Sequence, residues 1–233
     1  MNVLLVEDEE AIRGFVRINL KRNGMNVTEA ADGDEALRLI AEGALPDIAI
    51  LDIMLPTISG LELCRELRAA YPRLGIIMLT AKAQETDKVS ALELGADDYV
   101  TKPFSPVELI ARLKALHRRM QPEQKASANI QSGPFTLLRE ERKLLKDGRE
   151  IDLTPTEFAI MELFIGKANK SISRDEILDQ VWGRNYIGDL KIVDVNIRRI
   201  RQKIEEDPSR PAYIETVWGH GYLWKKEPVY EQH

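Results

Sequence analysis

The sequence has little cysteine, no long apolar run and no strong excess of charge of one sign. Its only cysteine, Cys64, excludes an internal disulfide and fits a reducing compartment. It falls on the apolar side of an expected helix, so we interpret it as a small buried side chain. No apolar stretch is long enough to cross a bilayer, and the N-terminus lacks the basic and cleavage segments of a signal peptide. These absences predict a cytoplasmic protein.

The charge balance argues only weakly against a nucleic-acid partner. The net charge of the 233 residues is −5, and 44% of them are hydrophobic, which is enough for packed cores. Residues 1–120 carry 15 basic and 19 acidic side chains, and residues 121–233 carry 18 and 19. Neither half is basic, so DNA binding would have to depend on local clusters of positive charge. The length predicts two domains.

The first half alternates short β-branched runs with segments of helical period. The runs lie at residues 3–6, 27–30, 48–51, 76–79 and 99–100, of which 27–30 is the weakest. Between two of them, residues 36–40 repeat apolar side chains at helical spacing, and a last helix is expected from Pro106 to about Arg119. This alternation predicts a doubly wound, five-stranded parallel α/β domain over residues 1–120, with a flavodoxin-like arrangement.

The pattern changes after a short polar segment. Residues 121–129 have no periodicity and are predicted to be a linker. Residues 130–153 then show short alternating runs, three helices are expected at 155–167, 174–182 and 190–205, and residues 214–224 are typical of a β-hairpin. The sequence therefore predicts an α+β domain over residues 130–226, followed by a tail at 227–233.

Reactive side chains of the first half follow the ends of its predicted strands. Glu7 and Asp8 come after the first strand, Asp52 after the third, Thr80 after the fourth and Lys102 after the fifth. The carboxyl ends of parallel strands form the usual ligand site of such sheets. Clustered carboxylates need a cation, oxygen ligands suit Mg²⁺, and an aspartate beside Mg²⁺ can attack phosphorus. Each residue taken alone is more often a helix cap or part of a solvated turn, and it is the joint pattern at successive strand ends that favours a site.

Four segments of this half closely resemble the receiver domains of bacterial two-component response regulators: Leu5–Asp8, Asp47–Pro56, Leu79–Ala81 and Gly95–Phe104. The resemblance implies that Asp52 accepts a phosphoryl group from a sensor histidine kinase. It also implies that Glu7, Asp8, Asp52 and the Met54 carbonyl hold Mg²⁺. Thr80 and Tyr99 would be a switch pair that moves when phosphate arrives. Lys102 would contact the phosphate, and the Lys102–Pro103 peptide bond would be cis. Without the resemblance, Tyr99 would be a plain strand aromatic.

The helix at 190–205 carries the strongest signal of the second half. Val193, Ile197, Ile200 and Ile204 recur at helical spacing and predict one buried face. Four polar residues are expected on the opposite face and two arginines beside it: Asn196, Arg199, Gln202 and Lys203, flanked by Arg198 and Arg201. Such a face suits the DNA major groove, with Arg199 and Asn196 as base-reading candidates, although a solvated basic face is an equally valid interpretation of the helix alone.

This half resembles the winged-helix effector domain of the OmpR/PhoB class in the segments Leu153–Phe158, Asp179–Gly183, Val193–Arg198 and Ile214–Tyr222. The resemblance implies that 190–205 is the recognition helix, that 213–224 is the wing and that loop 183–189 can contact RNA polymerase. Residues matching positions near the DNA backbone are Trp182, Lys191, Thr216 and Tyr222.

The wing departs from the family at Trp218, because the family usually has an arginine there that can enter the minor groove. An indole cannot act as a cation in a narrow groove. Three alternatives follow for Trp218. It packs on the sugars of the DNA backbone, or Lys225, Lys226 or His220 supplies the positive charge in the minor groove instead, or the indole covers the domain's own core.

Together these features predict a transcriptional regulator, activated by phosphorylation, that binds promoter DNA and is not an enzyme with a separate substrate. Phosphorylation is expected to drive symmetric dimerisation through the last helix–strand–helix face of the receiver. The residues expected on that face are Lys88, Val89, Leu92, Asp97, Asp98, Glu108, Ile110, Arg112 and Arg119. Two alternatives are a receiver-controlled protein-interaction module and a magnesium-dependent phosphatase, for which no second catalytic group is found.

Overall fold

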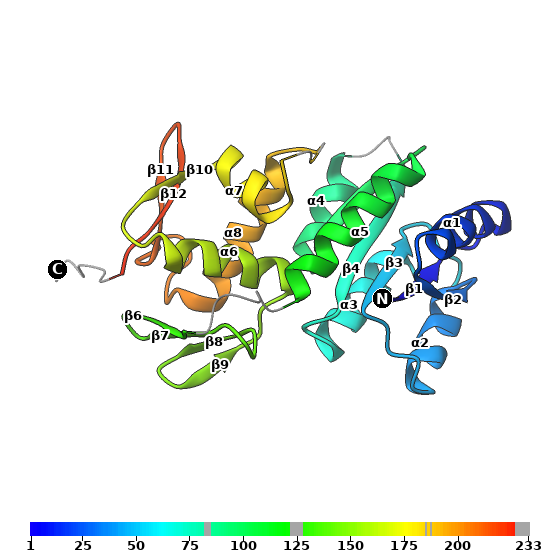
Figure 1. The fold of residues 1–233 in the computed structure, drawn as a ribbon, viewed down its shortest axis with the longest axis horizontal. Helices are drawn as coiled ribbons and strands as arrows, with labels where there is room; N and C mark the ends of the chain where they lie inside the picture. Colours follow the sequence, from blue (N-terminus) through cyan, green and yellow to red (C-terminus); the bar gives the residue numbers. More distant parts are fainter. Residues whose placement is uncertain (82–84, 122–127, 185, 187, 227–233) are drawn as a thin grey trace. The chain divides into compact units, whose positions relative to one another are not determined.

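The computed structural model describes residues 1–81, 85–121, 128–184, 186 and 188–226, with the side chains of 81–88 outside that description. The chain divides into two compact units, Met1–Met120 and Gln121–His233 (Figure 1). Within the described residues, no helix combines the length and apolar character needed to span a membrane.

The first unit is a five-stranded parallel sheet with helices between its strands (Figure 1). The sheet order is β2-β1-β3-β4-β5, and the order reverses beside β1 and β3, where a ligand site is expected. The elements in chain order are β1 (Asn2–Val6), α1 (Glu10–Arg22), β2 (Asn26–Ala30), α2 (Gly33–Ala41), β3 (Ile48–Asp52), α3 (Gly60–Ala70), β4 (Gly75–Ala81), α4 (Glu85–Glu93), β5 (Asp98–Lys102) and α5 (Pro106–Met120). The predicted α/β architecture is confirmed, including the weak strand β2.

Alternation along the central strands divides the core of this unit between the two faces of the sheet. On one face, Val3 and Leu5 of β1 pack in a cluster with Val16 and Leu20 of α1 and Leu113 of α5, all fully buried. β3 is buried along its whole length, as expected for a central strand covered on both sides. β3 pairs in parallel with β1 and β4, which places its last residue, Asp52, at the carboxyl edge of the sheet.

The described residues of the second unit form two antiparallel sheets and three helices. The elements are β6 (Ile130–Ser132), β7 (Phe135–Leu138), β8 (Lys143–Lys146), β9 (Arg149–Ile151), α6 (Pro155–Gly166), β10 (Ser171–Ser173), α7 (Arg174–Val181), α8 (Lys191–Ile204), β11 (Ile214–Val217) and β12 (Gly221–Trp224). The expected helices and the hairpin of β11 and β12 are confirmed. Strand β10 was not expected, because its three residues become a strand only by pairing with β12.

Helix starts in both units follow from capping chemistry. Ser59 before α3 and Thr154 before α6 each accept the backbone N–H of a glutamate three residues on, and that glutamate accepts the N–H of the cap. Both are capping boxes, which satisfy two otherwise unpaired donors at a helix start. They place α3 after Asp52 and α6 beside α8.

Candidate functional site

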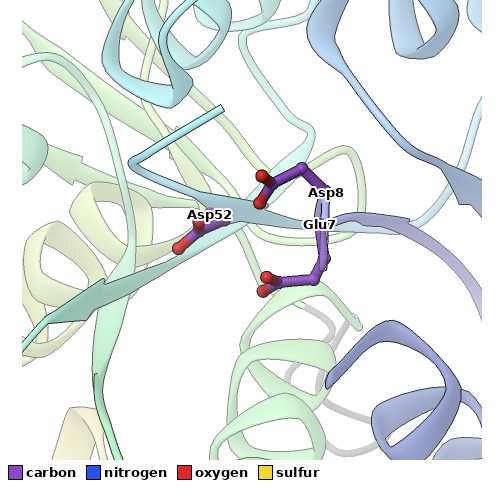
Figure 2. Close-up of side chains that lie close together, drawn as sticks. All are labelled: Glu7, Asp8 and Asp52. Carbon is purple, nitrogen blue, oxygen red and sulfur yellow. The ribbon is translucent and has the colours of Figure 1, made fainter. Parts of the chain in front are cut away.

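An acidic pocket lies at the carboxyl edge of the parallel sheet. Glu7 and Asp8 follow β1, Asp52 ends β3, and carboxylate oxygens of the three lie within 4.8 Å of one another (Figure 2). Glu7 and Asp52 are buried, whereas Asp8 is exposed to solvent. The structure thus brings together the three carboxylates that the strand ends predicted.

Lys102, at the end of β5, places its ammonium between two of these carboxylates. Its Nζ lies 2.8 Å from Glu7 Oε2 and 3.0 Å from Asp52 Oδ1. One ammonium therefore faces two buried carboxylates, with a third carboxylate at the rim. The peptide bond between Lys102 and Pro103 is cis, which confirms that expectation.

Burial and the neighbouring charges shift the pKa values of Glu7 and Lys102. Burial raises the pKa of the Glu7 carboxyl above its ordinary value, and repulsion from Asp52 adds to the rise although Lys102 opposes it. Burial by itself would lower the pKa of Lys102, but its hydrogen bonds to Glu7 and Asp52 raise it overall. Lys102 is thus held charged while Glu7 remains poorly compensated.

These residues fit a magnesium ion. The donors are hard carboxylate oxygens close enough to share one ion, and Asp8 is open to water, which Mg²⁺ usually retains in its coordination shell. A divalent cation would also offset the acidic charge that Lys102 leaves uncompensated. Glu7, Asp8 and Asp52 are therefore the residues that would hold it.

Two residues that the sequence did not single out shape this pocket. Arg13 of α1 donates from Nη1 to the carbonyl oxygens of Glu7 and Asp8, at 2.6 and 3.1 Å. These hydrogen bonds hold the backbone of the two acidic residues in place. At Gly60, the first residue of α3, a Cβ would overlap the carbonyl oxygen of Asp52, so only glycine fits. Spacing along the sequence could not reveal either role, because both depend on contacts between separate elements.

The remaining expected residues of the receiver site lie around the same edge. Thr80 near the end of β4 and Tyr99 in β5 are both buried, in neighbouring strands of the sheet. Met54, two residues beyond Asp52, is 73% exposed. Thr80 is the residue before the last in β4 and Tyr99 is the second of β5, and their role as a switch pair stays a prediction.

Helix α8 exposes a different face from the one predicted. The apolar residues from Val193 to Ile204 are buried as expected, but Asn196 is 0% and Arg199 only 6% exposed. Asn196 donates from Nδ2 to the carbonyl of Ile192 in its own helix, at 2.8 Å. The prediction that Asn196 and Arg199 read bases is wrong, because neither side chain reaches the surface.

A buried glutamate of α6 explains this burial. Glu157 is fully buried, and its carboxylate lies 2.8 Å from Arg199 Nη2 and 2.6 Å from Lys203 Nζ. It also accepts the N–H of Thr154 in the capping box. A buried charge needs such partners, so Glu157 holds Arg199 inside the domain and also pairs with Lys203, whose side chain stays exposed to solvent.

The face that α8 does expose carries Lys191, Arg198 and Gln202. These positions are separated by seven and four residues, close to two turns and one turn, so they form one stripe along the helix. Lys191 and Arg198, which were expected to contact DNA, are thus exposed to solvent, and so is Gln202.

A polar network joins α8 to the hairpin of β11 and β12. Tyr222 of β12 donates its hydroxyl to Asp194 of α8 at 2.6 Å, and Arg174 of α7 reaches the same carboxylate at 2.7 Å. Burial and the hydrogen bond to Asp194 raise the pKa of Tyr222 to about 12. Arg201 donates to the Ile214 carbonyl at 2.6 Å and to Thr216 Oγ1 at 2.9 Å.

Several expected phosphate contacts therefore have internal roles. Tyr222 is 5% and Trp182 only 3% exposed, so both aromatic rings belong to the core rather than to an exposed surface. Lys203 is paired with Glu157, and Thr216 accepts from Arg201. By contrast, Trp218 at the tip of the hairpin is 91% exposed, which excludes the expectation that it covers the domain's own core.

The expected dimer face is more internally paired than the sequence suggested. Asp97 is fully buried, accepts from Arg68 at 2.8 Å and from the N–H of Ile76, and is therefore not a surface charge. Arg112 pairs with Asp98 at 3.1 Å and with Glu108 at 2.8 Å within one chain.

The apolar centre expected for that face is also largely internal. Leu92 is 2% and Ile110 only 8% exposed, and Ile110 belongs to the core of the sheet. Arg119 is buried, Val89 is partly exposed, and the side chain of Lys88 lies outside the described residues. The sequence spacing located the helices correctly but not the depth of these side chains.

Comparison with known proteins assigns a family to each unit. Residues 3–114 match the response regulator receiver domain family, and residues 148–224 match the C-terminal domain family of transcriptional regulatory proteins. The chain belongs to the response regulators of the OmpR/PhoB type: a receiver joined to a winged-helix domain, forming a phosphorylation-dependent DNA-binding transcriptional regulator.

Among its relatives is the alkaline phosphatase synthesis transcriptional regulatory protein SphR of Synechococcus elongatus. The two are 44% identical over 229 residues, which cover 94% of this chain and 89% of SphR. DrrB, an OmpR/PhoB homologue from Thermotoga maritima, is 32% identical with a TM-score of 0.51 and covers 96% of this chain and 98% of its own. A mutant of RitR has the same coverages and a TM-score of 0.77, but at 24% identity it supports the fold alone.

Proposed function

We propose that Asp52 is the residue that accepts the phosphoryl group. The observation that carries this proposal is the position of Asp52 at a strand end, buried, beside Glu7 and Asp8 and 3.0 Å from the Lys102 ammonium. In the reaction, an Asp52 carboxylate oxygen bonds to phosphorus while the bond from phosphorus to the kinase histidine breaks, giving an acyl phosphate and a free histidine.

The residues around Asp52 would have separate roles in this step. Mg²⁺ held by Glu7, Asp8 and Asp52, with the Met54 carbonyl, would neutralise negative charge on the transferring group. Lys102 would pair with a phosphate oxygen, which requires it to leave Asp52 and Glu7 in part. Because Thr80 is close to the same edge, its hydroxyl would bond another oxygen and Tyr99 would move with it.

DNA binding by the second unit would use the exposed stripe of α8. Arg198 is the base-reading candidate, since arginine can donate two hydrogen bonds to guanine, and Lys191 would contact phosphate. Arg201 and Thr216 tie the hairpin to this helix, so both elements would meet the duplex together. Loop 183–189, of which residues 185 and 187 lie outside the described residues, would contact RNA polymerase.

The partners and targets proposed for this chain are those expected of its family. A sensor histidine kinase would supply the phosphoryl group, and alkaline phosphatase promoters are the first targets to test, given the name of the SphR relative. Phosphorylation would promote a homodimer in which the Arg112 pairs with Asp98 and Glu108 are exchanged between two copies. The chain would act in the cytoplasm and would not turn over a separate substrate.

Labelled phosphodonor and a mobility-shift assay test this function. Asp52→Asn should abolish acyl-phosphate formation, because an amide is not a competent nucleophile, and should remove the phosphodonor's effect on DNA binding. Asp34→Asn, on an exposed position of α2, is the matched control and should behave as wild type. Equal labelling of Asp52→Asn would refute the site. Labelling without any DNA binding would favour a protein-interaction module, and continuous hydrolysis of a phosphate ester would favour a phosphatase.

A further inference from the structure

The tip of the hairpin carries an isolated, solvent-exposed indole. The chain has three tryptophans, of which Trp182 and Trp224 are 3% and 0% exposed, whereas Trp218 is 91% exposed. Trp218 lies in the tight turn between β11 and β12, where Gly219 has a φ of 72° and His220 donates its N–H to the Val217 carbonyl. Among the described residues of the domain, nothing buries this large ring.

The hairpin that presents Trp218 is firmly anchored at its base. Trp224 of β12 donates to Ser132 at 2.8 Å and stacks on Tyr213 at a centroid distance of 5.6 Å. Two further contacts tie the hairpin to α8, through Arg201 to Thr216 and through Tyr222 to Asp194. Trp218 is therefore held at a fixed place relative to the exposed stripe of the recognition helix.

The surroundings of Trp218 offer little net positive charge. Lys225, just beyond β12, pairs with Glu215 at 2.9 Å across the hairpin, and Arg174, whose backbone N–H donates to the His220 carbonyl, pairs with Asp194 at 2.7 Å. The turn itself holds only Trp218, Gly219 and His220. A contact made by this tip with a duplex would thus depend on the indole surface and not on attraction between a cation and phosphate.

We propose that Trp218 is an apolar contact to DNA that reads the deformability of the duplex next to the bases read by α8. This inference rests on the proposed DNA binding by α8. The groove adjoining the major groove is the minor groove, where large apolar side chains act as wedges that partly unstack a base step. Pyrimidine–purine steps unstack easily and A-tracts resist it, so Trp218 favours sites with a flexible step at this position.

The three tryptophans make the contact directly measurable. Because Trp218 is the exposed indole, acrylamide should quench its emission selectively, and Trp218→Phe should remove that quenchable component. The probe is a duplex selected from a random pool by the phosphorylated full chain, with an unselected duplex of equal length as control. The selected duplex should protect Trp218 from acrylamide.

Binding measurements then test how the contact works. Trp218→Ala should weaken binding of the selected duplex about tenfold, within the range for base–aromatic stacking, and leave the slope of log affinity against log salt unchanged. Trp218→Phe should retain most of the affinity, and neither variant should change the melting temperature. Replacing the flexible step by an A-tract should weaken the wild type and leave Trp218→Ala unaffected.

The outcomes separate this inference from the proposed function. If the phosphorylated chain binds no duplex, the proposed DNA binding fails and this inference fails with it. If the chain binds DNA but Trp218→Ala binds equally well and the duplex gives no protection, the apolar contact alone is refuted. A loss of affinity that disappears at high salt would also refute it, since that result requires a charge-based contact.

Discussion

Two adjacent arginines of α8 should respond in opposite ways to truncation. Arg199 is 6% exposed and ion-paired with the fully buried Glu157, whereas Arg198 lies on the exposed face of the helix. Arg199→Ala should therefore reduce the stability of the second unit, and Arg198→Ala should reduce DNA binding. Each variant is the matched control for the other, because both replace an arginine of the same helix by alanine.

The magnitude for Arg199 follows from the burial of its partner. Removing one member of a buried ion pair leaves an uncompensated charge and costs about 3–5 kcal/mol. Lys203 still contacts Glu157 at 2.6 Å and is partly exposed, so it compensates some of this charge and the lower value is expected. At about 4 °C for each kcal/mol in a domain of this size, the melting temperature should fall by about 10 °C or more.

Calorimetry and binding to single-base variants of the selected duplex provide the assay. Arg198→Ala should melt as wild type and lose about 1–3 kcal/mol of binding with relaxed specificity at one base pair. Glu157→Gln combined with Arg199→Met should be more stable than Arg199→Ala, because no buried charge then lacks its main partner. If Arg199→Ala keeps the wild-type melting temperature and relaxes base specificity, the assignment of Arg199 to the interior is wrong.

Three further predictions concern the receiver and the hairpin. The acyl phosphate should persist for many minutes, because its hydrolysis needs a positioned water molecule. The thioether of Met54 cannot orient a water, and Lys82, outside the described residues, offers no acid or amide. A lifetime of seconds in the purified protein would contradict this. Arg112→Glu and Asp98→Arg should each weaken the phosphorylated dimer seen by sedimentation, and a mixture of the two variants should restore it only if the pair forms between copies. Finally, a raised pKa means that Tyr222 stabilises the fold below pH 10 and that this contribution is lost as pH rises towards about 12. Stability of wild type should therefore fall faster than that of Tyr222→Phe across that window, and parallel curves would refute the assignment.

Local patterns in the sequence determined the elements and the chemistry of the receiver site. Alternating apolar runs predicted the five parallel strands, and strand ends carry their residues to one edge of such a sheet. Glu7, Asp8, Asp52 and Lys102 therefore converge as expected. This inference succeeded because periodicity locates the end of each strand, and the helices between the strands act as crossover connections that make neighbouring strands parallel.

The depth of the polar and charged side chains, and of Trp218, was decided by the tertiary structure. Helical spacing places Arg199 on a polar face, but only the approach of Glu157, 42 positions earlier in the chain, makes burial of that charge favourable. In the same way, Arg68 withdraws Asp97 from the surface, while Trp218 stays exposed although its chemistry favours a core. A partner distant in sequence sets the cost of burying a polar group, and periodicity carries no information about such a partner.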